Sequence, residues 1–234
     1  MNKIAIAGNV FLLVAITACT DLGPVQPNEN YLQPVAQPGI GIIPANLSNI
    51  ESRAEDIVDI AQESNWSQID SDIADIDNSW VSYQPRASLD GVPQNLQNAV
   101  YNQILQLKMN AAAKNSLTTM QAANQLNLLV MNISDIYHPI VPTDIGRLDV
   151  YEYQIIIDVN NINYLAARQS LARVNTTWDR VKPSIMMHGG AIVASKFEHS
   201  LVMQSNALNM QNPQEIVSQA KIGLELVDEM EKLY

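Results

Sequence analysis

The chain has 234 residues, of which 47% are hydrophobic and 16% charged, a composition typical of a folded globular protein. Its 24 acidic and 13 basic residues give a formal net charge of −11. This charge excludes the basic surface of a nucleic-acid-binding protein, so we expect no nucleic-acid partner. It also disfavours electrostatic docking onto anionic lipid.

The N-terminal segment has the pattern of a secretory signal. One positive charge, Lys3, precedes an apolar stretch from Ile4 to Ile16, and the small residues Thr17 and Ala18 then lead to Cys19. An apolar stretch of this length is too short for a membrane-spanning helix, which needs roughly 20 residues. The pattern therefore indicates a segment that is cleaved rather than a membrane span.

Ile16-Thr17-Ala18-Cys19 resembles the lipobox of bacterial lipoproteins. The resemblance implies that residues 1–18 are removed and that Cys19 carries acyl chains, palmitate among them, which anchor the protein in a membrane. Thr20, rather than aspartate, follows the cysteine, and in well-studied Gram-negative lipoproteins this favours the outer membrane, facing the periplasm or the cell surface. An ordinary signal peptide with a free thiol, or a buried N-terminal helix, would be the alternatives. Cys19 is the only cysteine, so no intrachain disulfide is possible.

Residues 19–45 are rich in proline and predict a linker. Five of the eleven prolines lie between Thr20 and Pro44. Proline excludes a regular helix and favours an extended chain, which could reach roughly 75 Å from the bilayer at about 3.1 Å per residue. A solvated spacer is the simplest interpretation, and a proline-rich ligand for a partner's groove is the alternative.

Residues 46–137 form the first of two predicted helical repeats. Ser48 and Glu51 have capping-box spacing, and an apolar series from Trp66 to Tyr83, including Trp80, then steps by three and four. We expect a helix over 48–83 that ends before Pro85. A second helical segment covers Leu96 to Tyr137, with a kink or break at Asn115.

Residues 138–234 form the second repeat. The apolar series recurs 98 residues later from Tyr164 to Val181, with Trp178 in the place of Trp80 and Pro183 in the place of Pro85. A helical segment from Ala191 to Tyr234 follows, in which Asn212-Pro213 has the character of a helix start. The shared tryptophan and proline at one spacing indicate an internal duplication.

These patterns predict an all-α fold. Each repeat would be a helical hairpin, and both repeats would form one elongated up-down bundle of four long, partly broken helices. Trp80 and Trp178 would be equivalent core residues. The β-branched run from Tyr153 to Ile157 is the one strand-like segment, but it lies within a helical period that starts at Leu148.

Met186-Met187-His188 is the one candidate metal site. Thioether and imidazole ligands suit Cu(I), and Met203, Met210 and His199 could add ligands from the next helix. The alternative is that the methionines fill the core, because three consecutive side chains cannot all face one metal without a special turn.

Asn65 and Asn163 are candidate polar core positions. The apolar series changes phase at the first of them, because Ala61 to Trp66 is a step of five. A polar residue beside an aromatic one at both duplicated positions could fix the helix register in the core or line a ligand cavity. A simple stutter with the asparagine in solvent is the alternative.

The sequence does not predict an enzyme. It contains no nucleophile elbow, phosphate loop, dinucleotide fingerprint or paired Glu-x-x-His motif, so we expect no cofactor beyond the lipid on Cys19. The favoured function is a membrane-anchored, non-catalytic scaffold or protein-binding component of the cell envelope. A periplasmic ligand- or metal-binding bundle, possibly for copper, is the alternative, and an enzyme with an unrecognised site is a third and weaker one.

Overall fold

The computed structural model describes residues 41–234, which belong to one compact unit, Val35–Tyr234. The predicted signal peptide (residues 1–18), Cys19 and nearly all of the predicted linker lie outside the described residues. None of the helices in the described part is both long and apolar enough to cross a membrane.

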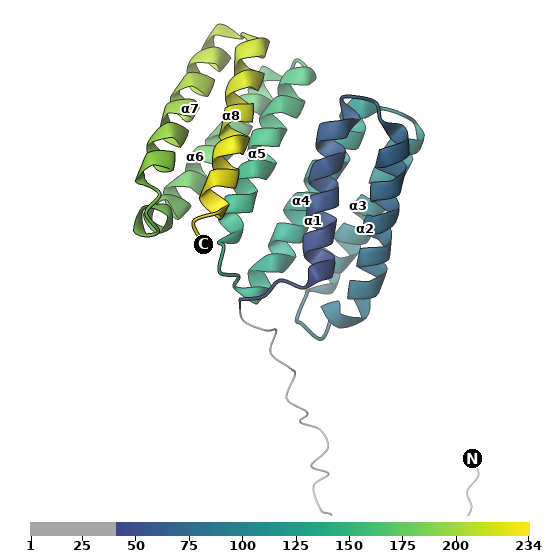
Figure 1. Ribbon diagram of the computed structural model, residues 1–234. Helices are drawn as coiled ribbons and strands as arrows, with labels where there is room; N and C mark the ends of the chain where they lie inside the picture. The colour runs from purple at the N-terminus through teal and green to yellow at the C-terminus, as the bar shows by residue number, and fades with distance from the viewer. Residues whose placement is uncertain (1–40) are drawn as a thin grey trace, which may run out of the picture. The chain divides into compact units, whose positions relative to one another are not determined.

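The described residues form helices and no strand, which confirms the all-α prediction (Figure 1). The elements are α1 (Ala45–Ala61), α2 (Trp66–Ala87), α3 (Gln94–Ala112), α4 (Ser116–Ser134), the 3₁₀ turn η2 (Asp135–Tyr137), α5 (Thr143–Asn160), α6 (Tyr164–Met187), α7 (Ala191–Met210) and α8 (Pro213–Glu231). The strand-like run from Tyr153 to Ile157 is part of α5, as its helical period predicts.

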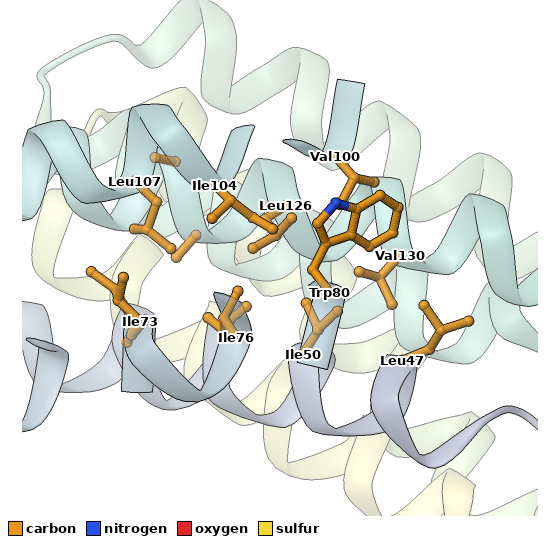
Figure 2. Packing of buried hydrophobic residues seen from close by; sticks show 14 of the residues in the cluster. Leu47, Ile50, Ile73, Ile76, Trp80, Val100, Ile104, Leu107, Leu126 and Val130 are labelled. Atoms are coloured by element: carbon orange, nitrogen blue, oxygen red, sulfur yellow. The ribbon is translucent and has the colours of Figure 1, made fainter. Parts of the chain in front are cut away.

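The buried apolar residues form two clusters. Helices α1–α4 surround the first, in which Trp80 of α2 lies among residues of α1, α3 and α4 such as Ile50, Val100 and Val130 (Figure 2). Helices α5–α8 surround the second, in which Trp178 packs against Phe197 with 4.9 Å between ring centroids. Both tryptophans are buried, as predicted. The described chain therefore has eight helices around two cores, where the sequence predicted four long helices around one.

Helices α4 and α5 join the two halves. They pack against each other, while α1 packs on α4 and α8 packs on α5. Ile157 of α5 belongs to the first core, and Tyr153 packs against both. The Tyr153 hydroxyl also donates a hydrogen bond to Asp59 of α1 at 3.0 Å. Apolar and polar contacts therefore connect the two halves.

Four short turns divide the long helical segments that the sequence predicted. A residue with left-handed backbone ends each segment: Ser64 (φ 59°), Lys114 (φ 52°), Ile162 (φ 57°) and Gln211 (φ 50°). An asparagine follows each of them, and its side-chain oxygen accepts a hydrogen bond from a backbone N–H of the next helix. An asparagine at this position satisfies a donor that a helix start would otherwise leave free. The segments predicted to be kinked or broken at Asn115 and Asn212 are fully broken there, and the predicted helix 48–83 is two helices.

The backbone pattern recurs at a constant spacing. Helices α5 and α6 begin 98 residues after α1 and α2, and α7 and α8 begin 97 residues after α3 and α4. Gly91 and Gly189, 98 residues apart, have φ values of 85° and 84°. Pro85 and Pro183 both lie inside their helices near the C-terminal ends, so the prediction that the helix ends before Pro85 is wrong.

Candidate functional site

A pocket of about 340 Å³ lies where the two halves meet. Helix α1 contributes residues from one half and α8 from the other, while α4 and α5 contribute Met131 and Gly146. Its lining consists of Ile43, Ser48, Glu51, Ser52, Glu55, Met131, Val141, Pro142, Thr143, Gly146, Asp149, Asp228 and Glu231. This volume is at the lower end of the range of pockets that hold small molecules, roughly 300–1,000 Å³.

The pocket is acidic. Five carboxylates line it: Glu51 and Glu55 from α1, Asp149 from α5, and Asp228 and Glu231 from α8. None of the described residues that line it is a lysine or an arginine. The carboxylates therefore face one another with no positive charge among them.

Asp149 is the most buried of these carboxylates, with 8% of the residue exposed. It has no ion-pair partner and no side-chain hydrogen bond within the described part of the chain. Glu51 and Glu55 are half-buried, and Asp228 and Glu231 are exposed at the rim. The pocket thus combines the unpartnered carboxyl group of a buried residue with carboxylates of residues that are more exposed.

Burial raises the pKa values of these groups. Burial, and then the charge of Glu231, raises the pKa of Glu51 to about 7. Burial, with the charges of Glu51 and Glu231, raises the pKa of Glu55 to about 8, against an opposing hydrogen bond from Asn127. Burial also raises the pKa of Asp149 well above its usual value, and the neighbouring acids, Glu55 first, add to this effect. Near neutral pH the pocket therefore holds protons that a positive ligand could displace.

One glycine and one amide contact the carboxylates of α1. A Cβ atom on Gly146 would lie 2.8 Å from Met131 Sδ and 3.6 Å from Glu51 Oε1, so glycine at this position lets α4 and the Glu51 carboxylate approach α5. Asn127 of α4 donates a hydrogen bond to Glu55 Oε1 at 3.2 Å, and its own side-chain oxygen is buried with no partner in the described structure.

Equivalent positions of the two halves line the pocket. Glu51 and Asp149 are 98 residues apart, as are Ser48 and Gly146. Equivalent faces of α1 and α5 therefore line the pocket. Met131 and Asp228 are 97 residues apart. The pocket thus arises from the way the two halves pack and not from either half alone.

Asn65 and Asn163 do not line it. Both are exposed and cap the starts of α2 and α6, where their side-chain oxygens accept hydrogen bonds from the backbone N–H groups of Gln68 and Ala166. The prediction that these asparagines are polar core positions is therefore wrong. The step of five from Ala61 to Trp66 marks the end of one helix and the start of the next.

Met186, Met187 and His188 lie at the solvent-exposed end of α6. The Met187 residue is 79% exposed. The His188 ring packs on Tyr234, and its Nδ1 lies 2.9 Å from the Ser184 carbonyl oxygen. The methionines therefore do not fill the core, and copper binding stays a prediction.

A larger groove of about 680 Å³ runs between α7 and α8. His199 and Met203, the further copper ligands suggested by the sequence, both line it. Its charged lining includes an ion pair, Lys196 Nζ to Glu229 Oε2 at 3.5 Å. This groove lacks the buried, unpartnered charge of the acidic pocket, so we regard the acidic pocket as the stronger candidate.

Comparison with protein-family models, curated proteins and solved structures finds no match to the chain.

No pattern in the sequence predicted the acidic pocket. Glu51 and Glu55 are four residues apart, and Asp228 and Glu231 are three apart, spacings that are also typical of a solvated helix face. A stronger signal was Asp149, which lies among the apolar residues of the helical period that begins at Leu148. An acid on the apolar side of a helix indicates a buried carboxylate.

Proposed function

We propose that this protein is a lipid-anchored, non-catalytic binding protein of the bacterial cell envelope, and that its acidic pocket receives a positively charged group of its ligand or protein partner. The observation that carries the proposal is Asp149, a buried carboxyl group without a partner that lines a pocket of further carboxylates. A buried acid without a counter-charge is costly to ionise, and a bound cation lowers that cost.

The anchor in this proposal is the lipid on Cys19. It is supported by the resemblance of residues 16–19 to a lipobox and by the acidic composition, which offers no electrostatic attraction to anionic lipid. Thr20 favours the outer membrane. The proline-rich residues up to 45 would then serve as a spacer between the membrane and the helices.

We also propose that the two halves arose by internal duplication. The support is the recurrence of helix starts, capping asparagines and left-handed turn residues at spacings of 97 and 98. On this view each repeat consists of two successive helix pairs, and the acidic pocket is a property gained when two copies packed together.

Thermal unfolding of the full chain in nonionic detergent tests the binding proposal. Three positively charged probes are compared at matched ionic strength: spermidine, a tri-lysine peptide and arginine methyl ester. At least one should raise the melting temperature, because a ligand at 100 times its Kd stabilises the folded state by about 2.7 kcal/mol. Asp149→Asn should remove the effect, and Asp179→Asn, an exposed acid on α6, should retain it. No response to any probe would contradict the proposal.

Membrane fractionation with labelled fatty acid tests the anchor. The wild-type chain should carry label and sediment with outer-membrane fragments, whereas Cys19→Ser should carry none. Label on the Cys19→Ser chain, or an unlabelled wild-type chain, would count against lipidation at this residue.

A further inference from the structure

The carboxylates of the acidic pocket are distributed along it instead of surrounding one point. They come from three helices, with Asp149 buried, Glu51 and Glu55 half-buried, and Asp228 and Glu231 at the rim. Within residues 41–234, no three histidine, cysteine or acidic side chains converge closely enough to hold a metal ion. A single small cation could therefore neutralise only some of these carboxylates.

Apolar side chains lie among the carboxylates. Ile43, Met131, Val141 and Pro142 line the same pocket. Apolar walls with acidic groups at different depths suit a molecule that alternates hydrocarbon segments with positive charges. An ammonium group can form charge-assisted hydrogen bonds with carboxylates while adjacent methylene groups contact the apolar walls.

We propose that the acidic pocket binds a linear aliphatic oligoamine, with one ammonium group at Asp149 and Glu55 and a second near Asp228 and Glu231 at the rim. This assignment rests on the proposed function, because it names the ligand class for the same pocket. The segment that precedes α1 in the sequence cannot supply the positive group, because residues 19–42 contain neither lysine nor arginine.

Charged groups outside the lining have both signs, and the two nearest arginines in sequence have acidic partners of their own: Arg53 of α1 pairs with Asp56, and Arg147 of α5 pairs with Asp135 and Asp144. Helix α1 adds Asp59 beyond Glu55, and α5 adds the fully buried Glu152, whose carboxylate accepts a hydrogen bond from Gln204 at 3.0 Å. Lys232, the residue after the C-terminal end of α8, partly offsets the charge of Glu231. The surroundings therefore leave the pocket negative once its acids are ionised.

Isothermal titration calorimetry of the full chain in nonionic detergent tests the ligand class. Spermidine, 1,4-diaminobutane, n-butylamine, MgCl₂, tri-lysine and arginine methyl ester are titrated separately at one ionic strength, because salt screens exposed charges. We expect spermidine and diaminobutane to bind about tenfold or more tightly than n-butylamine, since a second ammonium group binds intramolecularly after the first.

Two variants locate the site. Asp149→Asn should weaken spermidine binding, and Asp179→Asn should leave it unchanged. Gly146→Ala places a methyl group against Met131 and Glu51 without changing the charge, and should weaken spermidine binding as well. Circular dichroism of each variant confirms that it is folded. Equal affinity of the wild type and of Asp149→Asn for spermidine would overturn the assignment.

The other outcomes separate this inference from the proposed function. Equal binding of n-butylamine and spermidine, or tighter binding of tri-lysine, arginine methyl ester or Mg²⁺, would overturn the oligoamine assignment and leave a cation-binding protein. Binding of none of the six probes would overturn both.

Discussion

Single residues in this protein show how burial sets the chemistry of an acid. Asp149, Glu51 and Glu55 are ordinary carboxylic acids whose pKa values rise because α1, α5 and α8 bring them together away from water. Asp144 shows the opposite effect: the Arg180 guanidinium, which bonds to it at 2.7 Å, holds the pKa of that carboxyl below its usual value. Burial without a cationic partner raises the pKa of the first three acids, and the bonded guanidinium lowers the pKa of Asp144.

The raised pKa of Glu55 predicts how stability depends on pH. Between its ordinary value of 4.5 and about 8, the folded protein binds more protons than the unfolded chain, so stability should fall as pH rises through this range. Glu55→Gln, which mimics the protonated acid, should flatten the decline in melting temperature from pH 5 to pH 8. The control Glu225→Gln, an exposed acid on α8, should decline as the wild type does. Identical pH profiles for Glu55→Gln and the wild type would refute this explanation.

The two tryptophans should contribute similarly to stability. Trp80 is 1% exposed and Trp178 is 3% exposed, each within its own core. Truncation of either to alanine leaves a cavity and should reduce the free energy of unfolding by about 3–5 kcal/mol, measured by urea denaturation. Val81→Ala, at an exposed position of α2, should change it little. A negligible loss for both tryptophan variants would contradict the core assignment.

At the scale of elements, local patterns predicted the helices but not all of their ends. The apolar spacing predicted the helical segments and the burial of Trp80 and Trp178. The pair Asn212-Pro213 predicted a helix start. The prediction for Asn65 was wrong because a helix-capping asparagine and a polar core residue have the same local sequence pattern. Only the exposure of the side chain in the folded protein distinguishes the two. The sequence did not predict the left-handed turn at Ile162, because a β-branched residue is disfavoured in that backbone conformation.

The turn at Ile162 offers a test of this backbone strain. A branched residue at a φ of 57° is strained, whereas glycine adopts this conformation without strain. Because Ile162 is 78% exposed, removal of its side chain loses little packing. Ile162→Gly should raise the free energy of unfolding by up to about 1 kcal/mol. Ile140→Gly, also exposed but not at positive φ, should leave it unchanged or lower it. A loss of stability in Ile162→Gly would show that the side chain matters more than the backbone.

For the described residues as a whole, the acidic pocket is a product of tertiary packing. Its carboxylates come from positions between 51 and 231, and no local pattern reports that α1 and α8 flank the packed pair α4 and α5. The sequence therefore predicted the all-α fold class, but the pocket required the structure. Its position between equivalent faces of two similar halves links the proposed duplication to the proposed function.

The central claim is that a positive ligand replaces protons in this pocket. The most direct measurement is an NMR titration of the side-chain carboxyl carbons of Asp149 and Glu55, with and without spermidine, in the full chain. We predict that spermidine lowers the apparent pKa of both groups, because a nearby ammonium favours the ionised carboxylate. Unchanged titration curves in saturating spermidine would contradict the account.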